Sequence, residues 1–165
     1  METRTVDLGP CHCPGTPHER DEALIMTPAA MKFGIQRRVQ SAYEMEVNSA
    51  RAGLDSYGGL ADATLMALCV VSWTCADDKG QPLPIGIHAP SALASIDALD
   101  PETGMALHEV FFPQAVVVDG VTIPGDRSYA LRALTGVLLP NPSSAPSAAG
   151  QPAPTPTDSE PSPKD

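Results

Sequence analysis

The chain has 165 residues, of which 42% are hydrophobic, and a formal net charge of −10. An acidic surface repels phosphate, so nucleic-acid binding is disfavoured. Excess negative charge also keeps a protein soluble while it presents apolar surface to a partner. The longest apolar run, residues 65–71, is much shorter than the roughly 20 residues of a membrane-spanning helix, so we expect no membrane association.

The two ends of the chain differ from its middle. Residues 141–165 contain seven prolines but no aromatic residue and no Val, Ile, Leu or Met. Nothing in this segment offsets the entropy of ordering it, so we expect a disordered Pro/Ser/Ala-rich tail after one folded domain over residues 1–140. Residues 1–10 are polar, which indicates no secretory signal and therefore thiols kept in a reducing compartment.

The first segment, residues 1–26, is predicted to be a strand followed by a loop that contains Cys and His. Residues 3–8 alternate in polarity, which predicts a short strand that stops at Gly9-Pro10. The loop has the sequence CHCPGTPH, and it is followed by residues 22–26 (EALIM). This last segment predicts either a second short strand or the start of a helix.

Two main helices are predicted over residues 27–74. Thr27 is a candidate N-cap, and Pro28 fits the first helical position. Apolar residues recur at three- and four-residue spacing, which predicts a helix of about six turns. These residues are Met31, Ile35, Val39, Tyr43, Val47, Ala50 and Leu54. Gly53 is expected to end this helix. Residues 60–74 predict a second helix that is apolar on most sides and therefore central in the core.

Shorter elements follow these helices. Residues 75–82 predict a turn, and residues 89–99 predict a short helix that starts at Pro90 or Ser91. Residues 100–104 are expected to be a break between elements.

The C-terminal part of residues 89–139 predicts a hairpin and a last helix. Residues 116–123 form the hairpin, since its centre is an Asp-Gly pair, a strong two-residue turn signal. Residues 128–139 form the helix, with Asp126 as its cap. The predicted fold class is therefore α+β and mainly helical: a small helical domain with short β elements near both ends.

The loop at residues 11–18 contains candidate zinc ligands. Zinc prefers thiolate and imidazole ligands in a tetrahedron, and Cys11, Cys13 and His18 could supply three of them. A fourth ligand would come from one of several residues. These are His12, Asp21, Cys75, His88 and His108. A zinc ion here would be structural, and it would clip the first strand to the loop before the long helix.

Two other interpretations of this loop stay open. Only one residue separates the cysteines, where zinc sites usually have two, so the segment can instead be a turn fixed by Pro14 and Pro17. Alternatively, Cys13 and His18 could form a nucleophile–base pair. No oxyanion motif accompanies such a pair, and the sequence has no phosphate-binding glycine loop, serine elbow or HExxH motif. We therefore expect no enzymatic activity and no catalytic residue.

Two further patterns favour structural roles. Cys69 and Trp73 are four residues apart, which is typical of side chains packed in a core. Asp77, Asp78 and Gly80 lack the spaced acidic residues and the closing Glu of a calcium loop, so they predict a solvated turn.

Two stretches carry a resemblance to a known family. In CHCPGTPHERDE, which follows a strand ending VDLG, the matching residues are Cys11, Cys13, Pro14, Gly15, Thr16, Pro17, His18 and Asp21. In VVSWTCADDKGQPLPI they are Trp73, Asp77, Asp78, Gly80, Pro82 and Pro84. Together these stretches resemble tail assembly chaperones of long-tailed (siphovirus-type) phages that infect actinobacteria. The resemblance covers residues 5–100 and does not extend over residues 107–139.

The resemblance implies a non-enzymatic protein of the host cytoplasm. Such a chaperone binds the helical, aggregation-prone tape measure protein, keeps it soluble until tail tube protein polymerises around it, and is absent from the mature virion. The apolar stripe of the long helix is the candidate partner-binding surface, although a small helical domain needs the same stripe for its own core. The candidate residues are Met31, Ile35, Val39, Tyr43 and Val47.

Two alternative functions stay open. A structural tail or head–tail connector protein would be present in virions and would form rings, whereas a zinc-stabilised small regulatory protein would contain stoichiometric metal. The resemblance also implies a longer second product made by ribosomal frameshifting. Codons for Ser162-Pro163-Lys164 can spell a slippery heptamer, so we hypothesise that this chain is the short product.

Overall fold

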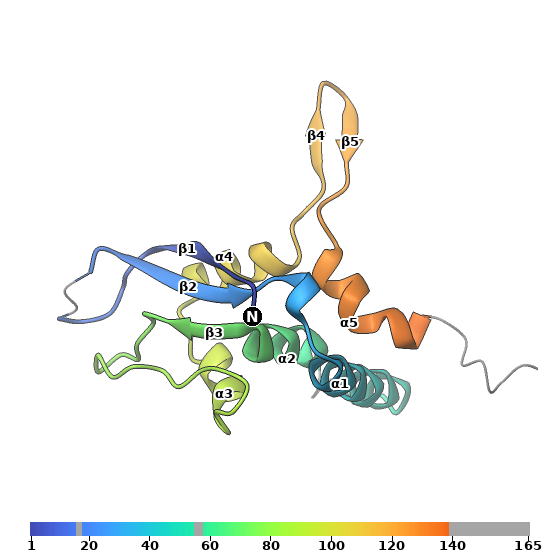
Figure 1. Cartoon of the computed structure of the whole chain (residues 1–165), viewed down its shortest axis with the longest axis horizontal. Coiled ribbons are helices and arrows are strands. Elements are labelled where there is room, and N and C mark those ends of the chain that lie inside the picture. Colours follow the sequence, from blue (N-terminus) through green and yellow to red (C-terminus); the bar gives the residue numbers. More distant parts are fainter. Residues whose placement is uncertain (16–17, 55–57, 139–165) are drawn as a thin grey trace, which may run out of the picture.

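The computed structural model describes residues 1–15, 18–54 and 58–138, and it has an α+β fold that is mainly helical (Figure 1). A three-stranded sheet packs against helices, and a two-stranded hairpin projects from the C-terminal part of the fold. The predicted fold class is thus confirmed. The predicted tail, residues 141–165, lies outside the described residues.

The three-stranded sheet is antiparallel and has the strand order β1-β2-β3. β1 (Thr3–Pro10) pairs with β2 (Arg20–Met26), and a bulge interrupts the register between Asp7 and Gly9. β3 (Val70–Trp73) pairs with the other side of β2, so β1 and β3 are the edge strands. The predicted first strand is confirmed, and it continues through Pro10, where we expected it to stop.

β2 resolves the choice between a strand and the start of a helix. Asp21, Ala23 and Ile25 are each at most 2% exposed, whereas Arg20 and Glu22 are exposed. Side chains at every second position of a strand share one face, and here that face points into the core. The segment is therefore a strand, and its alternation places the carboxylate of Asp21 on the buried side.

The long helix begins later than predicted. Pro28–Ala30 form a 3₁₀ turn (η1), and a short extended link separates this turn from α1 (Phe33–Arg51). The side chain of Thr27 makes no capping hydrogen bond. Its backbone N–H instead donates to the carbonyl of Glu2 at 3.1 Å, so the chain at this point is held beside β1 and enters the helix only afterwards.

The second predicted helix, over residues 60–74, is wrong in its C-terminal part. α2 (Leu60–Cys69) ends at Cys69, and the next residues form β3. The β-branched residues Val70 and Val71 and the aromatic Trp73 favour a strand, and pairing with β2 satisfies their backbone groups there. A continuous apolar run has no periodicity that distinguishes a buried helix from a buried strand.

The predicted break at residues 100–104 is also wrong. The carboxylate of Asp100 accepts hydrogen bonds from the backbone N–H groups of Glu102 (3.1 Å) and Thr103 (3.0 Å), and Pro101 takes the first helical position. The segment therefore begins α4 (Pro101–Phe111). The preceding short helix is confirmed as α3 (Ala92–Asp97).

The C-terminal hairpin and helix are confirmed. β4 (Val116–Val118) and β5 (Val121–Ile123) are joined by Asp119 and Gly120, both of which have positive φ angles, as a tight two-residue hairpin turn requires. α5 (Ser128–Leu138) follows, and the Asp126 carboxylate accepts a hydrogen bond from the N–H of Ser128 at 2.9 Å, as predicted for the cap.

The core joins the sheet to the C-terminal helices. Phe111 of α4 is fully buried, and its ring centroid lies 4.6 Å from that of Tyr129 on α5. The Tyr129 hydroxyl donates to the carbonyl of Met26 at the end of β2, at 2.7 Å. These contacts fix the two helices from which the hairpin projects.

Candidate functional site

The loop between β1 and β2 brings three metal-ligating side chains together. One ligand atom from each of Cys11, His18 and Asp21 lies within 4.8 Å of the others, so this group could hold a metal ion. We call it the Cys/His/Asp cluster. The backbone N–H of Cys11 donates to the carbonyl of Glu19 at 3.0 Å, which closes the loop where it leaves the sheet.

Asp21 is the buried member of the Cys/His/Asp cluster, with 2% of its surface exposed. Its Oδ1 atom lies 2.9 Å from Nε2 of His18 and accepts a hydrogen bond from the Thr74 hydroxyl at 2.9 Å. The N–H of Thr74 donates to the carbonyl of Glu22, so the pairing of β2 with the end of β3 holds this hydroxyl in place. A buried carboxylate is costly without partners, and the cluster supplies them. Its sulfur, nitrogen and oxygen atoms are ligands that zinc accepts.

Cys13 lies beside the cluster without belonging to it. Its N–H donates to Sγ of Cys11 at 3.4 Å, and its thiol donates to the carbonyl of Ala76 at 3.6 Å. The structure therefore groups two of the three predicted ligands, Cys11 and His18, with one of the predicted fourth ligands, Asp21.

The remaining candidates for a fourth ligand have other surroundings. Nε2 of His12 lies 3.2 Å from Oε2 of Glu102, and Nε2 of His108 lies 3.7 Å from Oδ2 of Asp62. His88 lies on a groove beside β3. Cys75 is 2% exposed, and burial raises the pKa of its thiol to about 12.

The proposed pairing of Cys13 with His18 as nucleophile and base does not fit this geometry. Nε2 of His18 lies against the carboxylate of Asp21. Burial raises the pKa of the Cys13 thiol, whereas an activated thiol needs a lowered pKa. That the protein has no enzymatic activity stays a prediction.

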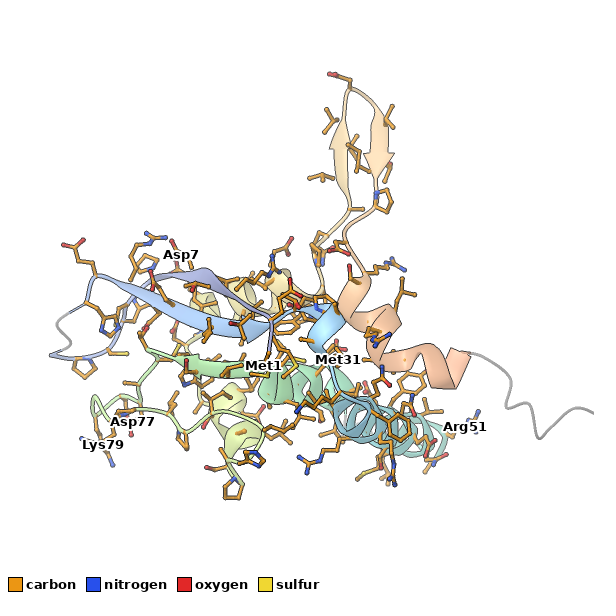
Figure 2. The ribbon with its side chains drawn as sticks, in the orientation of Figure 1. Met1, Asp7, Met31, Arg51, Asp77 and Lys79 are labelled. Carbon is orange, nitrogen blue, oxygen red and sulfur yellow. The ribbon has the colours of Figure 1, made fainter. Side chains whose placement is uncertain are left out.

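A groove of about 610 Å³ lies beside β3, and we call it the β3 groove. Its walls come from the end of β2, α2, β3 and the segment of residues 85–89, and Met1, labelled in Figure 2, lies at its margin. The apolar residues that line it include Met26, Leu68, Val70, Val71, Ile85 and Ile87. Lys32, which is exposed, also lines it and makes part of its rim cationic, and the exposed side chain of His88 lines it too. Its size lies within the range of pockets that bind ligands.

The outer wall of the β3 groove is held in place by hydrogen bonds to its backbone. The indole N–H of Trp73 donates to the carbonyl of Leu83 at 2.8 Å, and the Ser95 hydroxyl donates to the carbonyl of Pro84 at 2.6 Å. Gly86, with a φ of +109°, then passes close to β3, where a Cβ atom would lie 3.4 Å from the carbonyl oxygen of Val71.

The turn before this wall is as predicted. Oδ1 of Asp77 accepts hydrogen bonds from the backbone N–H groups of Lys79 (2.9 Å) and Gln81 (2.8 Å). Figure 2 labels Asp77 and Lys79 at the end of this loop. The carboxylate of Asp77 thus caps a turn, which agrees with the solvated turn expected from the sequence.

The hairpin forms a second apolar surface, and we call residues 114–125 the arm. Figure 1 shows the arm projecting away from the rest of the fold. The register pairs Val116 with Ile123 and Val118 with Val121, so these four side chains share one face of the arm. They are between 47% and 64% exposed. Val117, on the other face, is 67% exposed.

The base of the arm is held tightly. The N–H of Gln114 donates to the Glu109 carboxylate at 3.0 Å. Gly125 lies directly against Pro113, so that a Cβ atom at residue 125 would overlap the Pro113 carbonyl oxygen. The two legs of the arm therefore leave α4 and enter α5 in close contact.

The predicted partner-binding stripe on the long helix is mostly core. Met31, Ile35 and Val39 are at most 3% exposed, so they are not available to a partner in this conformation. Tyr43 and Val47 are half-buried, and contact of these two residues with a partner stays a prediction.

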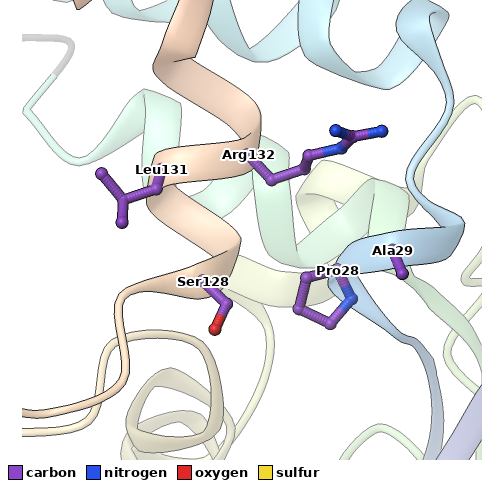
Figure 3. Close-up of a pocket in the computed structure, with 5 residues that line it drawn as sticks. All are labelled: Pro28, Ala29, Ser128, Leu131 and Arg132. Carbon is purple, nitrogen blue, oxygen red and sulfur yellow. The ribbon is translucent and has the colours of Figure 1, made fainter.

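A shallower hollow of about 440 Å³ lies between η1 and α5 (Figure 3). Ser128 and Arg132 interrupt its apolar lining of Pro28, Ala29 and Leu131. It is therefore less suited than the β3 groove to an apolar partner.

The sequence analysis missed both the β3 groove and the arm as candidate sites. The groove could not be found from sequence, because it gathers residues from segments far apart in the chain. The arm left a signal: the pattern VVVDGVTI is apolar at nearly every position of both strands, which a hairpin covered on one face does not need.

The fold and these features define an α+β protein with a Cys/His/Asp cluster, an apolar groove and a projecting apolar arm. No family model, no curated protein and no solved structure matches the chain. Among the helices of the described residues, none combines the length and the apolar character needed to cross a membrane. A proposed function must therefore rest on the residues of this chain.

Proposed function

We propose that this protein is a tail assembly chaperone that binds the tape measure protein of a long-tailed phage and keeps it soluble. The observation that carries the proposal is the β3 groove. An amphipathic helix binds by laying its apolar face into a groove of this kind, and a tape measure protein is expected to be a long helical client. The apolar wall formed by Ile85 and Ile87 would cover that face.

The residues that carry the family resemblance support the same proposal. Trp73 and Pro84 belong to the second resembling stretch, and they hold the outer wall of the β3 groove through the hydrogen bonds described above. Asp77, from the same stretch, caps the turn that leads into this wall. The motif thus builds the surface to which we assign client binding.

The net charge of −10 supports a solubilising role. Two of the ten Lys and Arg residues, Lys32 and Arg38, lie at the start of α1 and beside the groove. The remainder of the surface is dominated by carboxylates, which keep a complex of the chaperone and an apolar client from aggregating.

Replacing Ile87 with Glu is expected to reduce the amount of soluble tape measure protein about tenfold or more, because the new carboxylate would be desolvated in the occupied groove. The full-length chain is co-expressed with tagged tape measure protein from the same genome, and the soluble complex is quantified. Met105→Glu is the matched control, since Met105 is 74% exposed and does not line the groove. Equal loss in both variants, or no loss in either, would contradict the proposed role of the groove.

A structural tail or head–tail connector protein is the second candidate, and the arm favours it, because projecting arms can join neighbouring subunits. Mass spectrometry of purified virions separates the two functions. Absence of the chain from virions is expected for the chaperone. Its presence at a fixed copy number would establish a structural role instead.

We further propose that Cys11, His18 and Asp21 hold one structural zinc ion, and that the neighbouring Cys13 turns its thiol from the carbonyl of Ala76 to become the fourth ligand. The support is the chemistry of the donor set together with the burial of Asp21, whose carboxylate already has an orienting hydroxyl in Thr74. Such an ion would clip β1 to β2. A zinc-stabilised regulatory protein would share this feature, so the ion does not distinguish that function from a chaperone.

Protein purified without chelators is expected to contain about one zinc per chain, as measured by plasma mass spectrometry. Cys13→Ser is expected to lower both the zinc content and the melting temperature. His12→Ala is the control, because His12 lies in the same loop but contacts Glu102. Metal-free wild-type protein that keeps the fold would leave the loop as a simple turn.

A further inference from the structure

The arm is built in a way that requires a partner. A two-stranded hairpin is marginally stable alone in water, and it needs further strands or a packed face. Among residues 1–15, 18–54 and 58–138 the arm has neither, since its four clustered side chains are about half exposed and it projects away from the body (Figure 1). Its base is nevertheless fixed by the contact of Gly125 with Pro113. The arm therefore has a fixed base and an exposed apolar face, as expected for an element that binds to another surface.

Charge points to the β3 groove as the docking site. Across residues 114–125 the only charged side chain is Asp119, at the tip, and no Lys or Arg is present. The groove is apolar and carries Lys32 on its lining, while Arg38 lies next to its wall, with its guanidinium 3.5 Å from the carbonyl of Ile87. An apolar arm with an anionic tip therefore matches an apolar groove with a cationic rim.

Size favours the groove over a second arm. Full burial of one Val or Ile side chain removes roughly 60–120 Å² from water, so the half-exposed face of the arm offers only about 100–300 Å². A specific interface buries about 800 Å² on each partner. Two arms packed face to face fall far short of this area. An arm placed in the groove instead lies against apolar walls on more than one side, which include Val71, Ile85 and Ile87.

We propose that the arm of one copy occupies the β3 groove of a second copy, so that the free protein associates head to tail. In the groove the apolar face of the arm would lie against side chains of β3 and of the outer wall. This self-association stands apart from the proposed chaperone function. Where both hold, the client and the arm compete for the same groove.

The first test is the sedimentation of the full-length chain over a range of concentrations. The wild type is expected to sediment as an assembly larger than the 17.2 kDa monomer. Val118→Asp on the arm and Ile87→Glu in the groove are each expected to shift it to the monomer. Val117→Asp is the matched control on the opposite face of the arm, and it is expected to retain more of the assembly than Val118→Asp. Circular dichroism checks that each variant is folded.

The second test mixes the two defective variants. The Val118→Asp variant has a defective arm but an intact groove, which can still accept the intact arm of the Ile87→Glu variant. The mixture is therefore expected to form a one-to-one dimer that neither variant forms alone. Arm-to-arm pairing would give no such complementation. A monomeric wild type, association that survives either variant, or a mixture that stays monomeric would each overturn the proposal.

The two proposals fail separately. A monomeric protein that still solubilises tape measure protein through Ile87 would overturn only the arm contact. An assembly that dissociates in both variants but binds no client would overturn only the chaperone function.

Discussion

Replacing Phe111 with Ala is expected to lower the free energy of unfolding by about 3–5 kcal/mol, the range for removing a fully buried aromatic side chain. Phe111 is 0% exposed, and its ring packs against Tyr129 at a centroid distance of 4.6 Å. The substitution leaves a cavity where α4 and α5 meet the sheet. Urea denaturation followed by circular dichroism measures the change as a lower midpoint with an unchanged slope.

Phe33→Ala is the matched control for this prediction. Phe33 begins α1 and is 70% exposed, so its removal is expected to change stability by about 0.5 kcal/mol or less. Similar effects of the two substitutions would mean that α4 and α5 do not enclose Phe111 as described. Phe111 also supports the base of the arm, so its substitution is a test of the fold and not of the arm's docking.

The elements that could be predicted from sequence are those fixed by local interactions. The hairpin follows from an Asp-Gly pair between apolar segments, and the start of α5 follows from Asp126, whose carboxylate caps the helix two residues later. The strand predicted over residues 3–8 follows from its alternation, although β1 continues through Pro10. In each case the residues that determine the element lie within a few positions of it.

The elements that could not be predicted depend on partners far away in the sequence. Val70–Trp73 become a strand because β2, some fifty residues earlier in the chain, pairs with them. Residues 100–104 predict a break, although Pro101 is also a helix-start signal, and in the structure Pro101 is the first residue of α4. The first prediction failed because a distant strand decided the structure of a locally ambiguous segment. The second failed because a capping signal present in the sequence was not recognised.

In the candidate site, too, local features could be predicted from sequence, whereas features that depend on distant residues could not. Cys11 and His18 share one short loop, so their proximity could be anticipated. The place of Asp21 in the cluster depends on β2 turning that carboxylate toward the core and on Thr74 reaching it from the end of β3. The β3 groove depends on Trp73 and Ser95 holding a loop against an edge strand, and no local pattern encodes that arrangement.

Replacing Asp21 with Ala is expected to lower the free energy of unfolding of the metal-free protein by about 1–3 kcal/mol, because His18 and Thr74 lose their shared acceptor. Asp7→Asn is the matched control. Asp7 pairs with Arg20 at 2.8 Å, but both side chains are more than half exposed and screened by water, so Asp7→Asn is expected to change stability much less than Asp21→Ala.

Bound zinc is expected to contribute separately to the free energy of unfolding. At a free zinc concentration one hundred times the dissociation constant, binding to the folded state alone would stabilise the wild type by about 2.7 kcal/mol, and a chelator would remove this stabilisation. Asp21→Ala removes a ligand, so the chelator is expected to change its melting curve little. The two perturbations should then be strongly non-additive, since either one abolishes the same bound state. If the chelator lowered the stability of wild type and variant equally, Asp21 would not be a ligand. If it lowered neither, the Cys/His/Asp cluster would be a buried hydrogen-bonded group that ties the loop to the sheet without metal.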